Sequence, residues 1–314
     1  MSGVVAGSGT WVNWNPAAVH PEVEEESTLE LIEALFASDL VRGLDTSNNY
    51  GFGEAERRIG KAIARAGGVP DGFRLQTKAD RHPVTGDFSG ARVRESLEES
   101  RRNLGLDTLP VVYLHDPETM SWDDAFAADG AVAVLVEARD RGVIGKLGVA
   151  GGPASLMARY LLTGLFEALV THNRFTLVDR SSDGLLSLAA ELGVEVSNAS
   201  PYGGGYLTAW PPTTSRYAYD EASPEVRDAG ERASAICRRH GVPLAAAALE
   251  FSLSEPRITQ TIIGMQTVDD LVATRALVDS VVPEPVVAEL RDLVLDPAGW
   301  QDPPGSGREY FHAG

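Results

Sequence analysis

The chain has 314 residues, of which 43% are hydrophobic and 23% are charged, a composition typical of a folded protein with a large core rather than a disordered chain. Its formal net charge of −18 is spread along the chain without long runs of one sign, which disfavours binding to nucleic acid or to an anionic membrane. An acidic proteome or a saline niche would explain the same acidity, so the charge does not identify a substrate.

The single cysteine, Cys237, excludes an internal disulfide framework and a cysteine-based zinc site, which fits a reducing compartment. It lies in AICRRHG, a segment with a helical pattern, so we expect a buried structural thiol rather than a reactive one. The segment MSGVVAGSGTWVNW lacks a basic stretch followed by a long apolar run, and no apolar stretch of membrane-spanning length occurs elsewhere. We therefore expect a cytoplasmic protein that does not bind membranes.

Short apolar or β-branched segments bounded by turn residues recur along the chain, and stretches with helical periodicity lie between them. The strand candidates are 4–7, 42–46, 73–78, 110–115, 146–150, 168–172, 194–199 and 259–264. The helix candidates include 28–38, 53–66, 91–105, 153–164, 184–193 and a longer one that ends at 142. Strict alternation at this count predicts an α/β fold, a (β/α)₈ TIM barrel, rather than an open doubly wound sheet.

Two stretches interrupt the alternation. Residues 203–225 are rich in Gly, Pro, Ser and Tyr and predict a long loop over the C-terminal mouth of the barrel, with two helices before the last strand. The tail 298–314 carries turn residues together with Trp300, Tyr310 and Phe311, and it either folds over the same mouth or is disordered. Because no internal repeat or low-complexity linker marks a boundary, residues 1–314 are expected to form a single domain.

Four titratable side chains are expected at neighbouring strand ends. Asp45 lies at the end of the second predicted strand, Lys78 ends the third and His115 ends the fourth, while Tyr50 lies in the loop after the second. Active sites of parallel barrels lie at the C-terminal ends of the strands, so these groups should converge on one rim. Taken singly, each of these residues has a structural interpretation: a helix or turn cap, a residue that packs in a turn, or a hydrogen-bonded polar side chain. Their coincidence on adjacent strands predicts an active site.

The segments DTSNNYGFGE, LQTKAD and VVYLHDPE resemble, in order and spacing, the three signature segments of the aldo-keto reductase family. The resemblance extends from GSGTW near the start to IIGMQTVDDL near the end. It implies a nicotinamide cofactor and the interconversion of a carbonyl and an alcohol, with the cofactor carrying the hydride and no metal required. No GxxxxGK[ST] phosphate loop, HExxH pair or GxSxG elbow points to another chemistry.

The resemblance assigns roles to the four residues. Hydride transfer at carbon requires proton transfer at oxygen, and Tyr50 would be the proton partner. An unperturbed phenol has a pKa of about 10, so the Lys78 ammonium, held by Asp45, would lower the pKa of Tyr50. His115 would form a hydrogen bond with the substrate oxygen and orient it. Glu54 would support the Tyr50 loop or the Lys78 network.

The segment TIIGMQTVDDLVATRAL lies where this family binds the adenosine end of the cofactor. Members specific for NADP carry a Lys-Ser pair followed by an Arg at the 2′-phosphate, and the aligned residues here are Gly264, Met265 and Asp270. The missing positive charges and the acidic Asp270 would repel a 2′-phosphate, whereas a ribose hydroxyl of NAD would donate to the carboxylate. We therefore expect NAD, with NADP as the alternative. Asp270 has a second interpretation, that of a favourable charge opening a surface helix.

The other cofactor contacts implied by the resemblance are Thr10, Trp11, Asp45, Ser200 and Tyr202. Two customary contacts are changed in this chain. Ala150 and Gly151 replace a Ser-Asn pair that holds the carboxamide, and Ala199 replaces a Tyr that stacks on the nicotinamide. Asn173 and Arg174 are candidates to compensate.

NRFTLVDR, VSNASPYGGGYL and HDPE resemble the sugar-oxidising aldose dehydrogenase branch of the family, which includes enzymes for L-fucose, D-threo-aldoses and pyridoxal. The leading hypothesis is an NAD-dependent aldose 1-dehydrogenase that oxidises a sugar such as L-fucose to its lactone. The alternatives are an NADPH-dependent aldehyde or ketone reductase and a cofactor-sensing partner protein built on the same fold. We expect a small-molecule substrate and a monomer or small homo-oligomer; the sequence identifies neither the sugar nor the oligomeric state.

Overall fold

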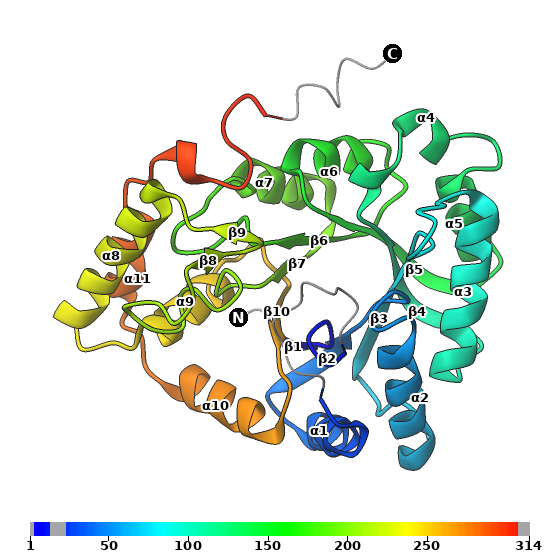
Figure 1. Ribbon diagram of the computed structural model, residues 1–314, viewed down its shortest axis with the longest axis horizontal. Coiled ribbons are helices and arrows are strands. Elements are labelled where there is room, and N and C mark those ends of the chain that lie inside the picture. Colours follow the sequence, from blue (N-terminus) through cyan, green and yellow to red (C-terminus); the bar gives the residue numbers. More distant parts are fainter. Residues whose placement is uncertain (1–2, 13–22, 307–314) are drawn as a thin grey trace.

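The fold is built around a closed barrel of eight parallel strands, seen in a computed structural model that describes residues 3–12 and 23–306. Neighbouring strands follow the order β1-β10-β7-β6-β5-β4-β3-β2. The bounds are β1 Gly3–Gly7, β2 Val41–Asp45, β3 Arg74–Ala79, β4 Leu109–His115, β5 Ile144–Gly151, β6 Ala168–His172, β7 Glu195–Ala199 and β10 Gln260–Gly264. Each overlaps a predicted strand, so the (β/α)₈ barrel is confirmed. Figure 1 shows the strands encircled by helices.

Most residues of the barrel strands are buried, because both faces of the sheet are covered. One buried cluster joins strands that are not neighbours, so its contacts cross the barrel interior; it consists of Val5, Val111, Tyr113, Ala150, Ala168, Val170 and Ile262. A larger cluster packs the outer faces of the strands against the helices. Gly43 permits close packing of β2 and β3, because an added Cβ would lie 2.6 Å from the Arg74 carbonyl oxygen.

Helices follow the strands in the predicted alternation. Their bounds are α1 Glu25–Ala37, α2 Glu54–Ala66, α3 Gly90–Leu104, α4 Trp122–Ala125, α5 Ala131–Asp140, α6 Ala154–Leu161, α7 Asp183–Leu192, α8 Pro224–Arg239, α9 Leu244–Leu253, α10 Val268–Asp279 and α11 Glu284–Arg291, with short 3₁₀ helices at Pro117–Thr119 and Pro297–Gly299. Gly67, Gly105 and Gly193 end three of them in the left-handed conformation.

One helix prediction needs correction. The long helix expected to end at 142 is divided into α4 and α5 by a tight turn at Gly130, where an added Cβ would lie 2.3 Å from the Asp124 carbonyl oxygen. Cys237 on α8 is buried, as predicted, and its burial raises the pKa of the thiol to about 11. Within residues 3–12 and 23–306, no helix combines the length and apolar character needed to cross a bilayer.

The long segment after β7 reaches the mouth of the barrel, as predicted, and Tyr219 from it lines the cavity there. It contains a short antiparallel hairpin that the sequence did not indicate, formed by β8 Arg216–Tyr217 and β9 Asp220–Glu221. Strands of two residues are too short to show a period-two alternation, which is why the segment was expected to be loop throughout.

The end of the described chain is fastened to the barrel rim. Asp302 accepts hydrogen bonds from Arg174 Nε at 2.8 Å and from the Ala154 backbone NH at 2.7 Å. The Gln301 backbone NH donates to Asp179 at 2.6 Å. Tyr310 and Phe311, which were considered as a cover for the mouth, lie outside the described residues.

Candidate active site

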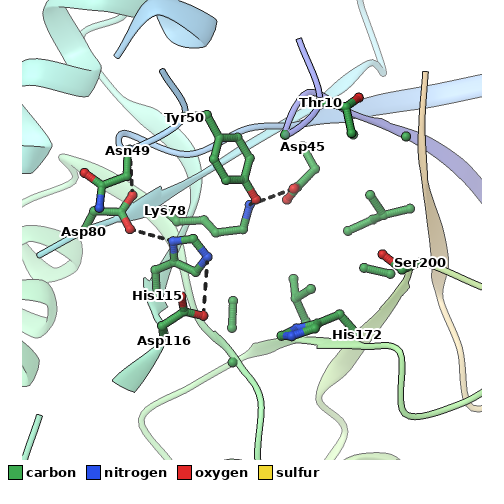
Figure 2. Close-up of a pocket in the computed structure, with 18 of the residues that line it drawn as sticks. Thr10, Asp45, Asn49, Tyr50, Lys78, Asp80, His115, Asp116, His172 and Ser200 are labelled. Carbon is green, nitrogen blue, oxygen red and sulfur yellow. Dashed lines mark hydrogen bonds and ion pairs between the residues drawn. The ribbon is translucent and has the colours of Figure 1, made fainter. Parts of the chain in front are cut away.

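A cavity of about 360 Å³ opens at the C-terminal ends of the barrel strands. The last residues of seven strands line it, namely Gly7, Asp45, His115, Gly151, His172, Ala199 and Gly264, and Lys78 enters from the remaining strand, β3. Tyr50 reaches the same cavity from the loop after β2. The structure therefore brings together the four residues that the sequence placed at one rim (Figure 2).

Lys78 is at the centre of a buried chain of polar contacts. Its Nζ donates to Asp45 Oδ2 at 2.7 Å, to the Thr46 carbonyl oxygen at 2.7 Å and to the Tyr50 hydroxyl at 3.3 Å. The other oxygen of Asp45 accepts from Gln76 Nε2 at 2.8 Å, which holds the carboxylate in place. Because β2 and β3 are parallel neighbours, their ends place Asp45 and Lys78 side by side without a long connection.

Burial and charge act in opposite directions on this chain. Burial alone would lower the pKa of Lys78, but the Asp45 carboxylate outweighs it and the pKa lies above its usual value. For Tyr50, burial raises the pKa well above 10; the Lys78 ammonium opposes this only in part, and Asp45 adds to the increase. The sequence-based expectation of a lowered Tyr50 pKa is therefore corrected: in the protein alone the phenol stays protonated near neutrality.

His115 faces the Tyr50 ring across the cavity, with the two ring centroids 6.1 Å apart. Its Nδ1 lies 2.6 Å from Asp80 Oδ1, and its Nε2 lies 3.6 Å from Asp116 Oδ1. Burial would lower the pKa of His115, but Asp116 and Asp80 outweigh burial and raise it. Sequence reasoning did not single out Asp80, although it stands in LQTKAD two residues after Lys78, the spacing at which strand side chains share a face.

Two further cavity residues were also missed. His172 ends β6, the sixth barrel strand, and its pKa is lowered to about 4 by burial and by Arg174, so its ring is neutral. Glu118 accepts from the Gly152 backbone NH at 2.9 Å, and its Oε2 is buried with no partner among the described residues. Burial raises the pKa of Glu118. The available signals were the strand-end position of His172 and the HDPE segment that contains Glu118.

Residues 7–294 match the aldo/keto reductase family, which is nearly the whole barrel. The chain belongs to the aldo-keto reductase family. It is therefore an oxidoreductase that uses a nicotinamide cofactor and acts on small-molecule carbonyl or sugar substrates.

The curated relatives of this aldo-keto reductase include sugar dehydrogenases. It is 29% identical to D-threo-aldose 1-dehydrogenase from a Pseudomonas species, over 82% of this chain and 85% of that protein. It is 28% identical to L-galactose dehydrogenase from Arabidopsis thaliana, over 80% and 77% of the two chains. These likenesses are consistent with the sugar dehydrogenase branch that the sequence indicated.

Solved structures agree with the fold. An aldo-keto reductase from Bacillus halodurans in its holo form matches 93% of each chain with a TM-score of 0.73 and 20% identity. Glycerol dehydrogenase from Gluconobacter oxydans matches 94% of each chain with a TM-score of 0.70 and 18% identity. At these identities the likeness concerns the barrel alone.

The predicted cofactor contacts of this aldo-keto reductase fall into two groups. Those that line the cavity are Thr10, Asp45, Ser200 and Gly264. Trp11 and Met265 are almost fully buried, and the Trp11 indole NH donates to the Met265 carbonyl oxygen at 2.5 Å. These two residues join the loop after β1 to the loop after β10 and thereby support the cavity wall. Tyr202 is half-buried outside the cavity lining, and its hydroxyl has no partner among the described residues.

Asp270 takes part in the N-terminal cap of α10, which is the structural role considered for it. Its Oδ2 accepts from the backbone NH groups of Gln266 and Thr267 at 2.8 and 3.0 Å, and Thr267 in turn caps α10. This reciprocal arrangement is a capping box. The carboxylate of Asp270 therefore lies at the N-terminus of α10.

The cavity combines a buried hydroxyl near β1 and β10 with an apolar lining, a combination that suits the amide and the flat ring of a nicotinamide. Thr10 Oγ1 is buried there with no partner in residues 3–12 or 23–306, and is free to bond a ligand. An added Cβ on Gly264 would meet only Thr10, at 3.8 Å, so the space beside it is open. The apolar lining consists of Ala150, Val170, Ala199 and Ile262. Thr10, Ser200 and Gly264 would thus hold the nicotinamide cofactor.

Glu54 does not join the Lys78 network, which corrects one of its two expected roles. Its carboxylate lies 2.9 Å from Arg57 Nε and 3.1 Å from Arg58 Nε. Arg58 Nη1 donates in turn to the Thr28 hydroxyl at 3.0 Å. Glu54 therefore fixes the start of α2, directly after the loop that carries Tyr50.

Proposed function

We propose that this aldo-keto reductase is an NAD-dependent aldose 1-dehydrogenase that oxidises the anomeric carbon of a cyclic sugar, such as L-fucose, to the lactone. The observation that carries the proposal is the Tyr50 hydroxyl, hydrogen-bonded to Lys78 and facing a cavity with further polar groups. The cavity lining also contains two carboxyl groups and an imidazole ring, from Asp116, Glu118 and His172. A polyhydroxylated substrate can bond to these groups, whereas a simple aldehyde would leave them unpaired.

The proposed chemistry divides between cofactor and protein. When bound, the nicotinamide would supply the acceptor for the hydride that leaves the anomeric carbon. The Tyr50 oxygen accepts the proton of the anomeric hydroxyl, and the electron pair of the broken O–H bond becomes the second bond of the lactone carbonyl. Lys78 stabilises the phenolate that accepts this proton, Asp45 keeps Lys78 charged and placed, and His115 Nε2 holds the substrate oxygen.

The preference for NAD is part of the proposal. The first turn of α10 carries Asp269 and Asp270, so a 2′-phosphate placed there would meet negative charge. Arg275, further along α10, is paired with Asp39. In the proposed site Thr10, Ser200 and Gly264 contact the cofactor, Trp11 and Met265 support them, and Tyr202 and Asp270 face its adenosine end.

One observation favours the alternative function, an NADPH-dependent reductase of aldehydes or ketones. The raised pKa of Tyr50 keeps its hydroxyl protonated near neutrality, which suits donation of a proton to a carbonyl oxygen. The same residues would then act in the opposite direction.

The test is a screen for NADH formation with L-fucose, D-arabinose, L-galactose and pyridoxal, repeated with NADP. We expect at least one aldose to be oxidised, with kcat/KM for NAD about tenfold or more above that for NADP, a difference of about 1.4 kcal/mol. The Tyr50→Phe variant is the control for turnover at this site. No oxidation of any aldose, together with reduction of aldehydes by NADPH, would establish the alternative instead.

A further inference from the structure

Asp80 lies at the centre of a buried network that links the loops after β2 and β3 to the end of β4. It follows β3, and its side chain is almost fully buried. Its Oδ1 lies 2.6 Å from His115 Nδ1 at the end of β4. Its Oδ2 accepts from the Asn49 backbone NH at 2.9 Å and from the Ser47 hydroxyl, both in the loop that carries Tyr50. The Asp80 carboxylate therefore contacts both His115 and the loop that carries Tyr50 (Figure 2).

The contact with Asp80 decides which ring nitrogen of His115 faces the cavity. A carboxylate at hydrogen-bond distance from Nδ1 requires a proton on Nδ1, since the carboxylate can only accept. Nε2 then remains for the substrate. Asp116 Oδ1 lies 3.6 Å from Nε2, which is beyond hydrogen-bond distance, so this carboxylate does not hold Nε2 by a hydrogen bond.

The charges around His115 favour its protonated form. The titratable groups that face it are Asp80 after β3, Asp116 and Glu118 after β4, Lys78 on β3, Tyr50 after β2 and His172 at the end of β6. Burial would raise the pKa of Asp80, but His115, Ser47 and Asn49 outweigh it and lower the pKa, so Asp80 carries its negative charge. A charged acceptor on Nδ1 stabilises the imidazolium, which can donate from Nε2.

We propose that Asp80 is a positioning residue: it orients the His115 ring with Nε2 toward the cavity and stabilises its charged form, so that His115 donates to the substrate oxygen. This inference rests on the proposed function, because it assigns His115 to the reacting oxygen. The donor acts where negative charge develops on that oxygen during proton and hydride transfer. Asp80 would act through His115 and not on the reacting atoms.

The first arm of the test needs no turnover. Nitrogen NMR of the full-length protein, with His115 assigned through His115→Gln, reports the protonated ring nitrogen and the titration midpoint. In the wild type we expect a proton on Nδ1 and a midpoint above the ordinary value of about 6.5. Asp80→Asn should lower the midpoint by about one pH unit or more, because it removes the adjacent negative charge. An unchanged tautomer and midpoint would overturn the proposal.

The second arm measures carbonyl reduction as a function of pH. Asp80→Asn should lower kcat by roughly 10- to 100-fold, which is less than the full rate enhancement that a well-placed general acid or base gives. The KM for the cofactor should stay near the wild-type value. The pH above which the rate falls should move lower, since His115 loses its proton earlier. Asp80→Glu keeps the charge, so it should retain the raised His115 midpoint and recover part of the lost kcat.

Glu56→Gln is the matched control. Glu56 is a buried carboxyl that accepts from the Thr77 hydroxyl at 2.6 Å and has no contact with His115, so the same chemical change there should leave the His115 midpoint unchanged. Thermal unfolding verifies that each variant is folded. If Asp80→Asn is not folded, the kcat of Asp80→Glu decides, because a displaced carboxylate should lower kcat below the wild-type value. A wild type that oxidises no aldose would refute the proposed function and leave the NMR arm intact. An active wild type whose Asp80→Asn variant keeps kcat, pH profile and midpoint would refute the role of Asp80 alone.

Discussion

At the scale of single residues, the Tyr50 hydroxyl responds to three influences that differ in direction. Burial withdraws water from the phenolate and raises the pKa, Lys78 at 3.3 Å lowers it, and Asp45 reduces the effect of Lys78. The net increase means that only a small fraction of phenolate exists near neutrality. Tyr50 can therefore accept a proton only when its hydroxyl has been deprotonated, which Lys78 and an alkaline pH both favour.

We therefore expect sugar oxidation to accelerate with pH. The basic form of Tyr50 is present above its pKa, so kcat/KM for oxidation should rise by about tenfold per pH unit from neutral into alkaline pH. Carbonyl reduction needs the protonated form, present below the pKa, and should show no such rise. Initial rates in both directions over this range make the comparison, and an oxidation rate that is already constant at neutral pH would contradict it.

Two variants distinguish the contributions of Tyr50 and Lys78 to this pH dependence. Tyr50→Phe removes the proton acceptor, and the remaining rate should lie roughly 10²- to 10⁴-fold below the wild type at every pH. Lys78→Met removes the cation that opposes the burial of Tyr50, so its pH dependence should be displaced to higher pH.

At the scale of elements, the β8–β9 hairpin brings one aromatic ring into the core and another to the mouth. Tyr217 is buried and its hydroxyl donates to the Asn173 carbonyl oxygen at 2.8 Å. Gly203 has a φ of +59°, and a Cβ there would lie 2.2 Å from the Tyr217 ring, so glycine is required beneath the hairpin. Ala218 turns the chain, and Tyr219 then lies against His172 with ring centroids 5.8 Å apart.

We predict that Tyr219 contributes to substrate binding through its ring. Tyr219→Ala should raise the KM for the aldose by roughly three- to tenfold, corresponding to about 0.5–1.5 kcal/mol for an aromatic contact, with kcat little changed. Tyr219→Phe keeps the ring and serves as the control, so its KM should stay near that of the wild type. Steady-state kinetics with the best aldose decide the point. An unchanged KM in Tyr219→Ala, or an equal rise in Tyr219→Phe, would count against the prediction.

At the scale of the whole molecule, the last described segment closes the barrel rim by an ion pair between distant parts of the chain. Arg174 donates to both oxygens of Asp302, at 2.8 and 3.1 Å, and their side chains are only 9% and 15% exposed. Asp302→Ala would leave a guanidinium buried without its carboxylate. We expect it to reduce the free energy of unfolding by about 3–5 kcal/mol.

Urea unfolding measures this loss, and an exposed pair provides the comparison. Glu26 pairs with Arg65 at 3.2 Å, and both side chains are largely exposed, so Glu26→Ala should reduce the free energy of unfolding far less than Asp302→Ala does. Similar losses for Asp302→Ala and Glu26→Ala would show that the Arg174 pair is no more than a surface contact.

Much of the fold could be predicted from the sequence because its signals are local. The buried strands β1, β4 and β6 appear as short apolar segments, and Gly67, Gly105 and Gly193 mark helix ends by a conformation that favours glycine. Motif spacing placed Asp45, Lys78 and His115 at consecutive strand ends, and parallel strand ends meet at one rim. The same local signals did not separate α4 from α5 or reveal the β8–β9 hairpin.

Other properties depend on distances that only the tertiary structure establishes. Whether Lys78 lowers the pKa of Tyr50 below 10 depends on the balance between their contact and the loss of water, and burial prevails. Asp80 acquires its importance from His115, which is 35 residues away in the chain and 2.6 Å away in space. The sequence thus determined the barrel and the side chains gathered at its rim, because periodicity and spacing are short-range. The tertiary structure decided their pairing and protonation, because these depend on burial and on contacts between separate strands.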